Sequence, residues 1–231
     1  MISFINMSWI VLDKPLGISS NLANVIVRRL LRAKKAGYIG TLDKMASGIL
    51  PIAIDSSTKL IHSFSGACKT YEFDMKFGIK TNTGDVEGSI EAVSDYIPTY
   101  NEIISALPLF FGDIAQTPHK FSAVHVNGRR AYDLARAGQS VDMTSKTKIV
   151  TVHNLQLLHY QPPVLRMIVD CSAGFYVRSL CEDIAVYLNS VAHVTYLRRT
   201  KLASFTLDQK SELYCLPFNS SFKLLKVLQS L

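Results

Sequence analysis

The chain has 231 residues, 48% of them hydrophobic, and carries a formal net charge of +7. This length and composition suffice for one sizeable core, which excludes a wholly disordered chain. No apolar run reaches the ~18 residues that a membrane-spanning helix requires, so we expect no association with a membrane. The basic surplus favours a polyanionic partner, and nucleic acid is the plainest example.

The cysteines and histidines lack the spacing of a disulfide framework or a metal site. The four cysteines are Cys68, Cys171, Cys181 and Cys215. We therefore expect free thiols, no bound metal and a reducing, cytoplasmic location. The apolar N-terminus does not match a secretory signal peptide, because Asp13 and Lys14 interrupt it.

The first predicted strand covers residues 8–12 and ends in a turn that contains proline and glycine. Ser20 suits the N-cap of a following helix with apolar residues at helical spacing, and Gly37 is its expected stop. Positive charge is concentrated here, since residues 1–36 hold six basic residues and a single acid. Four basic residues lie in the last turns of the helix, where cations suit the helix dipole: Arg28, Arg29, Arg32 and Lys35.

A glycine-containing loop is expected at residues 37–48, followed by a buried strand at 49–54. Strict alternation over residues 69–77 predicts a strand with one apolar face. That face consists of Tyr71, Phe73, Met75 and Phe77. The polar, glycine-containing residues 81–88 predict a loop.

Thr99 and Glu102 have the spacing of a capping box, which predicts a helix that Pro108 ends. The later elements are expected as a strand at 121–126, a helix at 130–137 closed by Gly138, strands at 148–160 and 164–171, a helix from Gly174 to about Leu188, a strand at 193–197 and a terminal helix at 218–231. This order predicts an α+β fold with a mixed, mainly antiparallel central sheet flanked by helices. We expect a single catalytic domain over residues 1–208 and a short tail over residues 209–231.

The loop at residues 37–48 is the first candidate for chemistry. It holds three glycines, which allow close approach of the backbone, and one acid at its centre, Asp43. A carboxylate in such a loop can act as a nucleophile or as a base. The alternative interpretation is that Asp43 caps a helix that starts at Lys44.

Three further segments have both a functional and an ordinary interpretation. Arg178, two residues after Tyr176, either holds a buried acid in its charged form or is a surface arginine. Tyr71 either stacks on an unpaired base or belongs to the core. The late basic run Tyr196-Leu197-Arg198-Arg199-Thr200-Lys201 either contacts phosphates or forms a solvated face.

Taken together, these segments resemble one family, the TruB family of bacterial tRNA pseudouridine synthases, from about residue 8 to residue 205. The blocks occur in family order: 12–20 as the first motif, 37–51 as the catalytic motif, 69–71 as the tyrosine motif, 81–88 as the following loop, 112–132 as the middle block, 171–178 as the arginine motif and 192–199 as the last block. The joint order of the blocks carries the resemblance, because each block alone is only suggestive.

The resemblance implies a pseudouridine-synthase-like fold and the isomerisation of uridine to pseudouridine at position 55 in the T-loop of tRNA, without a cofactor. Asp43 would be the catalytic carboxylate, acting on the ribose C1′ or on a ribose proton. Arg178 would pair with Asp43 and keep it charged. Tyr71 would stack under the extruded uracil and help to remove the C5 proton.

The resemblance also implies residues that bind the substrate. Tyr176 and Leu197 would line the base pocket, and Lys14 would support the catalytic loop. The family usually has His where Tyr38 stands, so we expect Tyr38 to act as an aromatic wedge at the flipped base.

Other departures from the family pattern are Ile39, Lys44-Met45 and Asn82. About 26 residues follow Phe205, so we expect no complete C-terminal RNA-binding PUA domain. The expected partner is the T-arm of tRNA, bound by a monomer without an obligatory protein partner. A non-catalytic RNA-binding protein or tRNA-folding chaperone of the same fold is the alternative, and a guide-RNA-dependent relative is a third possibility.

Overall fold

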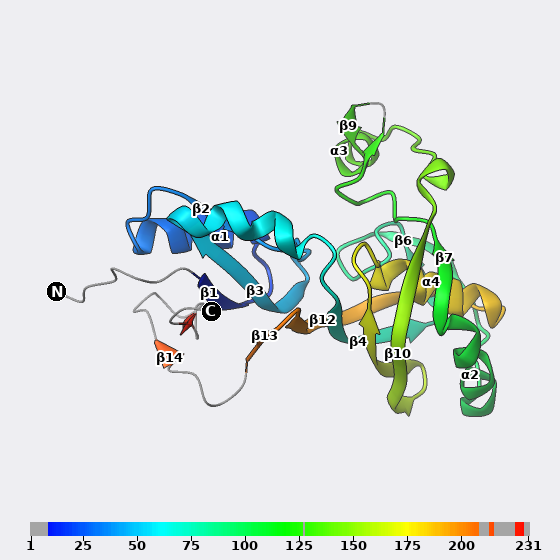
Figure 1. Cartoon of the computed structure of the whole chain (residues 1–231). Coiled ribbons are helices and arrows are strands. Elements are labelled where there is room, and N and C mark those ends of the chain that lie inside the picture. Colours follow the sequence, from blue (N-terminus) through cyan, green and yellow to red (C-terminus); the bar gives the residue numbers. More distant parts are fainter. Residues whose placement is uncertain (1–8, 127, 208–212, 215–224, 229–231) are drawn as a thin grey trace. The chain divides into compact units, whose positions relative to one another are not determined.

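A computed structural model describes residues 9–126, 128–207, 213–214 and 225–228 (Figure 1). The chain forms two compact units. The first unit comprises residues 1–71 and 197–231, and the second unit comprises residues 72–196. Two strands, β4 (Lys69–Phe77) and β12 (Ala192–Leu202), carry the chain from one unit into the other.

The helices are α1 (Ser20–Leu30), α2 (Tyr100–Ala106), α3 (Ala131–Arg136) and α4 (Val177–Tyr187), with 3₁₀ helices η1 (Asp55–Phe64), η2 (Leu107–Phe110) and η3 (Thr144–Lys146). The other strands are β1 (Trp9–Lys14), β2 (Ala36–Tyr38), β3 (Ala46–Ile54), β5 (Ile79–Thr81), β6 (Ile90–Val93), β7 (Gly112–Gln116), β8 (His125–Val126), β9 (Arg129–Arg130), β10 (Lys148–Gln161), β11 (Val164–Cys171), β13 (Phe205–Thr206), β14 (Leu213–Tyr214) and β15 (Leu225–Leu228). Among the described helices, none combines the length and the hydropathy that a membrane span requires.

The sheet of the first unit has the strand order β14-β15-β1-β3-β12, with β2 added on β3 and β13 on β12. β1 runs antiparallel to β3, so that Lys14 lies opposite Gly48. β12 runs parallel to β3, with Leu197 opposite Ala46 and Arg199 opposite Gly48. These pairings bring the end of β1, the start of β3 and the middle of β12 side by side.

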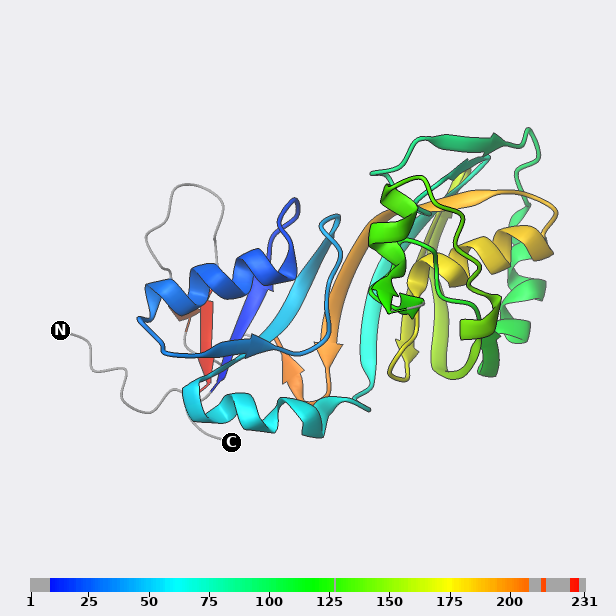
Figure 2. The same ribbon diagram turned by 90° about the horizontal axis from the view of Figure 1, so that it is seen from above.

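The first unit has apolar side chains packed on both faces of its sheet. On one face, Ile10 and Leu12 of β1 pack with Ala23 and Val27 of α1. On the other face, Trp9 packs edge to face against the ring of Phe64 in η1. Figure 2 shows the strands of this unit between α1 and η1. Because both faces are covered, β3 is buried along its whole length, and its residues 49–54 form a continuous apolar run.

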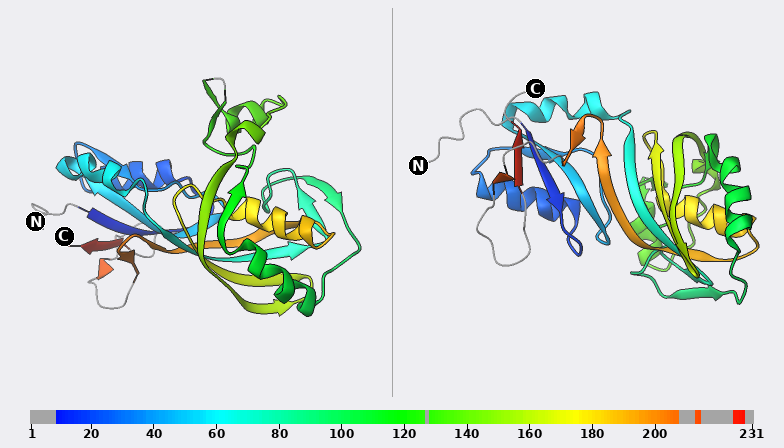
Figure 3. Two further views of the ribbon diagram at one scale, coloured as in Figure 1. Left: turned by 45° about the vertical axis from the view of Figure 1, so that its right-hand side comes forward. Right: turned by 90° about the horizontal axis from the view of Figure 1, so that it is seen from below.

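In the second unit the strand order continues as β12-β4-β11-β10-β7. β10 and β11 form a long antiparallel hairpin, and β7 pairs antiparallel with β10. Figure 3 shows α4 lying along one face of these strands. The residues of α4 on the packed side are fully or almost fully buried: Leu180, Cys181, Ile184 and Ala185. The short β8–β9 hairpin and α3 project from the sheet of this unit (Figure 1).

The α+β fold class with a mixed central sheet is confirmed, and so are several elements. β4 has the predicted bounds, and its alternating residues Phe73, Met75 and Phe77 are buried. The predicted capping box is present at the start of α2, where Thr99 and Glu102 exchange hydrogen bonds. These elements depend on local periodicity or on a short motif, which explains why the sequence predicts them.

The predicted ends of the first helix are wrong. Ser19 rather than Ser20 is the N-cap, since its Oγ accepts a hydrogen bond from the Leu22 N–H. The helix ends at Leu30, and Arg32 adopts the left-handed conformation with φ of 52°. The Ala33 N–H then donates to the Arg28 carbonyl, as in a Schellman motif.

Gly37, the expected helix stop, lies in β2 instead. A Cβ on Gly37 would stand 2.5 Å from Cδ1 of Ile61, so this glycine allows η1 to pack closely against the strand. Its role is therefore close packing rather than helix termination.

Two other predicted elements differ. Of the strand predicted at residues 121–126, only His125–Val126 forms, because the ring of Phe121 packs instead with His119 and Tyr132. Of the helix predicted at residues 218–231, Leu225–Leu228 form a strand that pairs with β1, and the remainder lies outside the described residues. The division into residues 1–208 and a tail stays a prediction.

Candidate active site

Asp43 lies in the loop that joins β2 to β3, and its side chain is half-buried. Lys44 and Met45 form a turn, and the Ala46 N–H donates to the Asp43 carbonyl at 3.1 Å. β3 begins at Ala46. The interpretation of Asp43 as the cap of a helix at Lys44 is therefore wrong, and the carboxylate is not committed to that role.

The start of α1 and the turn before it hold both neighbours of Asp43. The Ser20 Oγ accepts from the Leu42 N–H at 2.8 Å and donates to the Leu42 carbonyl at 2.9 Å, and both bonds are buried. The Gly17 N–H donates to the Lys44 carbonyl at 2.8 Å. The main chain on either side of Asp43 is thus fixed by hydrogen bonds to residues more than twenty positions earlier.

Lys14 supports this segment from inside the first unit. Its side chain is fully buried, and its Nζ donates to the carbonyls of Pro15 and Ile18, each at 2.9 Å. A buried ammonium requires such acceptors, because its desolvation is otherwise costly. Lys14 therefore fixes the turn that carries Gly17, which in turn bonds to the Asp43 loop.

β12 contributes three consecutive residues beside the same loop. Leu197 is 5% exposed and lies opposite Ala46, three residues after Asp43. Arg198 forms a bidentate ion pair with Asp13, with N–O distances of 3.0 and 2.7 Å. Arg199 is fully buried and donates to the carbonyls of β3 and of the loop.

The interpretation of Arg198-Arg199-Thr200-Lys201 as one basic surface is therefore wrong. Arg199 has no exposed surface, whereas the side chain of its neighbour Arg198 is 30% exposed. Alternation along a strand places neighbouring side chains on opposite faces, which separates what the sequence reads as one run.

The two predicted aromatic contacts of the first unit are both at least partly buried. Tyr38 is half-buried and packs against the apolar cluster around Val27 and Ile52. Tyr71 is 7% exposed, the largest exposure on the buried face of β4. The contacts of these rings with a substrate stay predictions.

Arg178 lies in the first turn of α4 in the second unit and is 6% exposed, so it is not a surface arginine. Its Nη1 donates to the Thr83 carbonyl at 2.9 Å and lies 3.4 Å from Oδ2 of Asp85, and its Nη2 donates to the Phe121 carbonyl at 3.0 Å. These partners lie 57 to 95 positions away and orient the guanidinium. The pairing of Arg178 with Asp43 stays a prediction.

Asp85 orders the loop that carries these partners. It is 2% exposed, and its Oδ1 accepts from the Thr83 hydroxyl at 2.7 Å and from the Glu87 N–H at 3.0 Å. The main-chain carbonyl of Asp85 accepts from the Thr81 hydroxyl at 2.6 Å. The loop at residues 81–88 is thus a fixed support for Arg178.

Tyr176 is the N-cap residue of α4, and its main chain is held by Gln116. The Tyr176 N–H donates to Oε1 of Gln116 at 2.7 Å, and Nε2 of Gln116 donates to the Tyr176 carbonyl at 3.0 Å. Gln116 is 1% exposed. The ring of Tyr176 is half-buried, with Nζ of Lys148 5.9 Å from its centroid.

Sequence reasoning missed the contacts of four residues that hold predicted site residues or their loops: Ser20 and Arg199 in the first unit, and Asp85 and Gln116 in the second. Each acts through a main-chain group or an ion pair far away in the sequence, so local spacing gives no signal for that partner. The signal in the sequence is that Asp85 and Gln116 fall within two of the blocks that resemble the family, residues 81–88 and 112–132.

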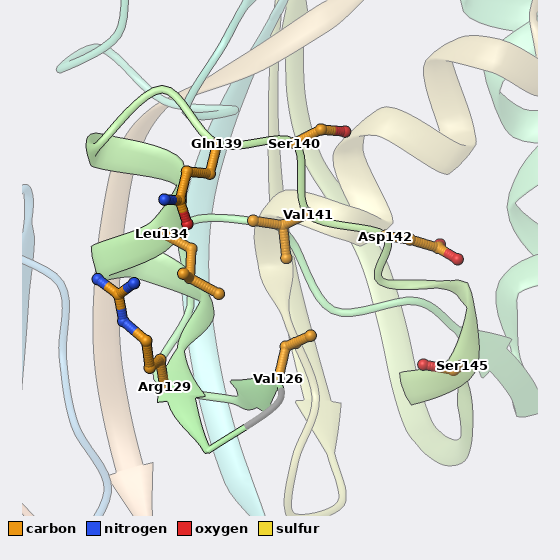
Figure 4. Close-up of a pocket in the computed structure, with 8 residues that line it drawn as sticks. All are labelled: Val126, Arg129, Leu134, Gln139, Ser140, Val141, Asp142 and Ser145. Atoms are coloured by element: carbon orange, nitrogen blue, oxygen red, sulfur yellow. The ribbon is translucent and has the colours of Figure 1, made fainter.

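A hollow of about 560 Å³ lies in the projecting segment of the second unit (Figure 4). Its lining consists of Val126, Arg129, Leu134, Gln139, Ser140, Val141, Asp142 and Ser145, and includes no predicted site residue. Hydrogen bonds from Thr144 lower the pKa of Asp142, so this carboxylate stays charged and committed to a local turn. Within the described residues, no cluster of three His, Cys, Asp or Glu side chains is arranged for a metal ion.

Comparison with known families gives a match over most of the chain. Residues 28–177 match the model of the TruB family pseudouridylate synthase (N terminal domain), and residues 178–216 match the tRNA pseudouridylate synthase B C-terminal domain. The chain belongs to the TruB family. Asp43, Tyr71 and Tyr176 fall within the first TruB match, and Arg178 and Leu197 fall within the second.

Curated TruB relatives carry the name tRNA pseudouridine synthase B. The chain is 44% identical to the protein of Wolbachia pipientis subsp. Culex pipiens over 87% of its own length and 57% of the relative's. It is 44% identical to the protein of Pseudomonas aeruginosa over 87% and 65% of the two lengths. The chain thus spans less than two thirds of these relatives.

Solved structures confirm the fold. A Cbf5-Nop10-Gar1 complex contains a chain with 27% identity and a TM-score of 0.67, which covers 89% of this chain and 51% of that chain. An H/ACA RNP bound to a substrate RNA containing 2′-deoxyuridine gives 25% identity and a TM-score of 0.66, over 88% and 50% of the two chains.

Proposed function

We propose that this chain isomerises uridine to pseudouridine at position 55 in the T-loop of tRNA, with Asp43 as the catalytic carboxylate. Membership of the TruB family and the names of its curated relatives support the reaction. The observation that carries the role of Asp43 is that hydrogen bonds fix the main chain on both sides of it. Buried hydrogen bonds fix Leu42 before it, and the Gly17 N–H fixes Lys44 after it.

The reaction is a rearrangement that conserves all atoms. The bond between N1 of uracil and C1′ of ribose breaks, the base rotates, and C5 forms a new bond to C1′. The C5 proton leaves and N1 gains a proton, so neither a cofactor nor an oxidant takes part. Asp43 acts either by adding to C1′ or by removing a ribose proton, and both roles require an ionised, fixed carboxylate.

Access to the target requires that the nucleotide leaves its stack, at a cost of about a few kcal/mol. Stacking of the extruded uracil on Tyr71 would return roughly 1–3 kcal/mol of that cost. Tyr176 and Leu197 would line the pocket, and Tyr38 would stand at its entrance in place of the family's histidine.

Arg178 would pair with Asp43 and keep it charged, because a neighbouring guanidinium stabilises the ionised carboxylate. Three acceptors within its own unit already hold its guanidinium, among them Asp85. A side chain held in this way loses little further conformational entropy when it pairs with a catalytic group.

The RNA arm would be held by the basic end of α1, where Arg28, Arg29, Arg32, Lys34 and Lys35 are all exposed. Phosphate contacts of this kind position the RNA without reading its sequence. We further propose that the chain acts in the cytoplasm as a monomer and without an obligatory protein partner.

The test is the Asp43→Asn variant assayed with an unmodified T-arm RNA and the purified chain alone. Asparagine keeps the shape of the side chain but can neither attack nor accept a proton, so we expect the rate to fall at least roughly 10²–10⁴-fold. The affinity for RNA should be retained. Release of tritium from C5-labelled uridine measures the rate, and filter binding measures the affinity.

The matched control is Asp95→Asn, which changes an exposed aspartate in the second unit and should keep the parental rate. Parental activity of Asp43→Asn would refute the role of Asp43. RNA binding by the parent chain without any pseudouridine formation would support the non-catalytic chaperone instead.

A further inference from the structure

Arg199 is a fully buried arginine of β12, and its guanidinium donates hydrogen bonds to main-chain carbonyls. Its Nε donates to the Ile49 carbonyl at 2.8 Å. Its Nη2 donates to the Gly40 carbonyl at 2.8 Å and lies 3.4 Å from the Ile39 carbonyl. Within the described part of the chain it forms no ion pair. Burying a guanidinium without an acidic partner costs free energy, so this arrangement requires an explanation.

The acceptors of Arg199 lie at the two ends of the segment that contains Asp43. Ile39 and Gly40 begin the loop, and Ile49 lies in β3 just after it. One planar group therefore fastens both ends of the segment to each other. The geometry suits arginine alone, since Nε and Nη2 point at carbonyls nine residues apart while lysine has a single nitrogen.

Two glycines make room for this arginine. A Cβ on Gly40 would lie 2.9 Å from its Nη1, and a Cβ on Gly48 would lie 2.2 Å from the Arg199 carbonyl oxygen. Both glycines also have positive φ, of 66° and 101°. The glycines that the sequence places around Asp43 thus serve the close approach of Arg199 to the backbone.

We propose that Arg199 is a positioning residue for the isomerisation, and that its guanidinium sets the path of residues 39–45 and hence the place of the Asp43 carboxylate. This inference rests on the proposed function. Arg199 acts through the loop and contacts no reacting atom. It complements Ser20 and Gly17, which hold the residues directly beside Asp43.

The experiment compares Arg199→Lys with Val27→Ala, a core change in α1 that destabilises the same unit but leaves Arg199 and its carbonyl acceptors unchanged. For Arg199→Lys we expect the maximal single-turnover rate on T-arm RNA to fall by about 10²-fold, the effect of a misplacement of about 1 Å. The RNA dissociation constant should stay parental. Val27→Ala changes the cluster on which Tyr38 packs but not the contacts of Arg199, so it should lose much less rate than Arg199→Lys wherever it is folded.

Hydrogen exchange supplies a readout that does not depend on activity. Arg199→Lys should raise exchange selectively in residues 39–45, and Val27→Ala should not. If the parent forms no pseudouridine, the proposed function fails while the exchange result still tests the positioning role. A parental rate for Arg199→Lys, or exchange raised no more than in Val27→Ala, would overturn the inference.

Gly40→Ala tests the same contact should Arg199→Lys fold poorly. Its added Cβ displaces the guanidinium, so Gly40→Ala should lose rate, and the double variant should lose no more than the worse single variant. Rate losses that simply multiply in the double variant would show that Gly40 and Arg199 act independently, which contradicts the inference.

Discussion

Two adjacent serines show how neighbouring residues divide their work. The Ser19 Oγ accepts a hydrogen bond from the Leu22 N–H at 3.1 Å and thereby caps α1. The Ser20 Oγ instead forms buried hydrogen bonds with the N–H and the carbonyl of Leu42. Removing a helix cap costs about 1 kcal/mol. Removing the Ser20 hydroxyl strands two buried polar groups, at a cost of roughly 1–3 kcal/mol each when unsatisfied.

We therefore predict different outcomes for Ser19→Ala and Ser20→Ala. Both should lower the free energy of unfolding, by about 1 kcal/mol for Ser19→Ala and by roughly 2–6 kcal/mol for Ser20→Ala, which leaves two buried groups unsatisfied. Only Ser20→Ala should also slow pseudouridine formation, because Leu42 precedes Asp43. Urea unfolding and single-turnover rates at saturating RNA measure the two effects. Equal rates in the two variants would show that the hold on Leu42 does not matter for the reaction.

The sequence identified Asp43 but assigned the wrong task to Ser20. Asp43 stands out because it is the single acid between glycines. Ser20 was predicted to be the helix cap because either serine fits that local pattern. Its true partner is 22 residues away, and such a contact exists only once β1, α1 and β3 have packed.

At the scale of an element, the N-terminus of α2 is held by one carboxylate, Glu102, which accepts several hydrogen bonds. Glu102 accepts from the Thr99 N–H and hydroxyl at 2.7 and 2.6 Å, and from the Tyr96 hydroxyl at 2.5 Å. The bond from the Thr99 hydroxyl and that from Tyr96 lower the pKa of Glu102 to about 2. The N-terminus of α2 is therefore tied to the preceding loop through one ionised side chain.

We predict that Glu102→Gln destabilises the chain most at neutral pH. A carboxylate with a lowered pKa contributes stability above its ordinary value of 4.5 and loses it as the pH falls toward about 2. The difference in urea midpoint between the parent and Glu102→Gln should thus be full at pH 7 and shrink below pH 4.5. Asp95→Asn is the control outside the capping box. A difference that is constant between pH 7 and pH 3 contradicts the assignment.

Elements were predictable where their pattern is local. β4, β11 and α4 follow from alternation or helical spacing, since each buries one continuous face. The prediction of a strand at residues 121–126 is mostly wrong. The ring of Phe121 packs against other aromatic rings, and its carbonyl accepts a hydrogen bond from the Arg178 guanidinium. Leu225–Leu228 form a strand because the edge of β1 offers unpaired main-chain groups, which no local pattern reveals.

At the scale of the whole molecule, the predicted site residues come from separate parts of the chain. Lys14, Asp43 and Leu197 belong to the first unit, and Tyr176 and Arg178 belong to the second. Order of motifs predicted the family and the fold, but it carries no distances. The partners that hold the Arg178 guanidinium, Asp85 and the Phe121 carbonyl, are therefore visible only in the structure.

The net charge of +7 permits a last prediction about RNA binding by the whole chain. If the basic end of α1 contacts phosphates, Arg29→Gln/Lys35→Gln should weaken binding of T-arm RNA. The slope of log affinity against log salt concentration should fall by about 2, one for each lost phosphate contact. Lys59→Gln/Lys80→Gln removes the same two charges from elsewhere on the surface, where Lys59 is exposed and Lys80 is 37% exposed. Because both pairs change the net charge equally, an equal loss of slope would mean that overall charge, rather than α1, attracts the RNA. Titrations between 50 and 200 mM salt distinguish these outcomes.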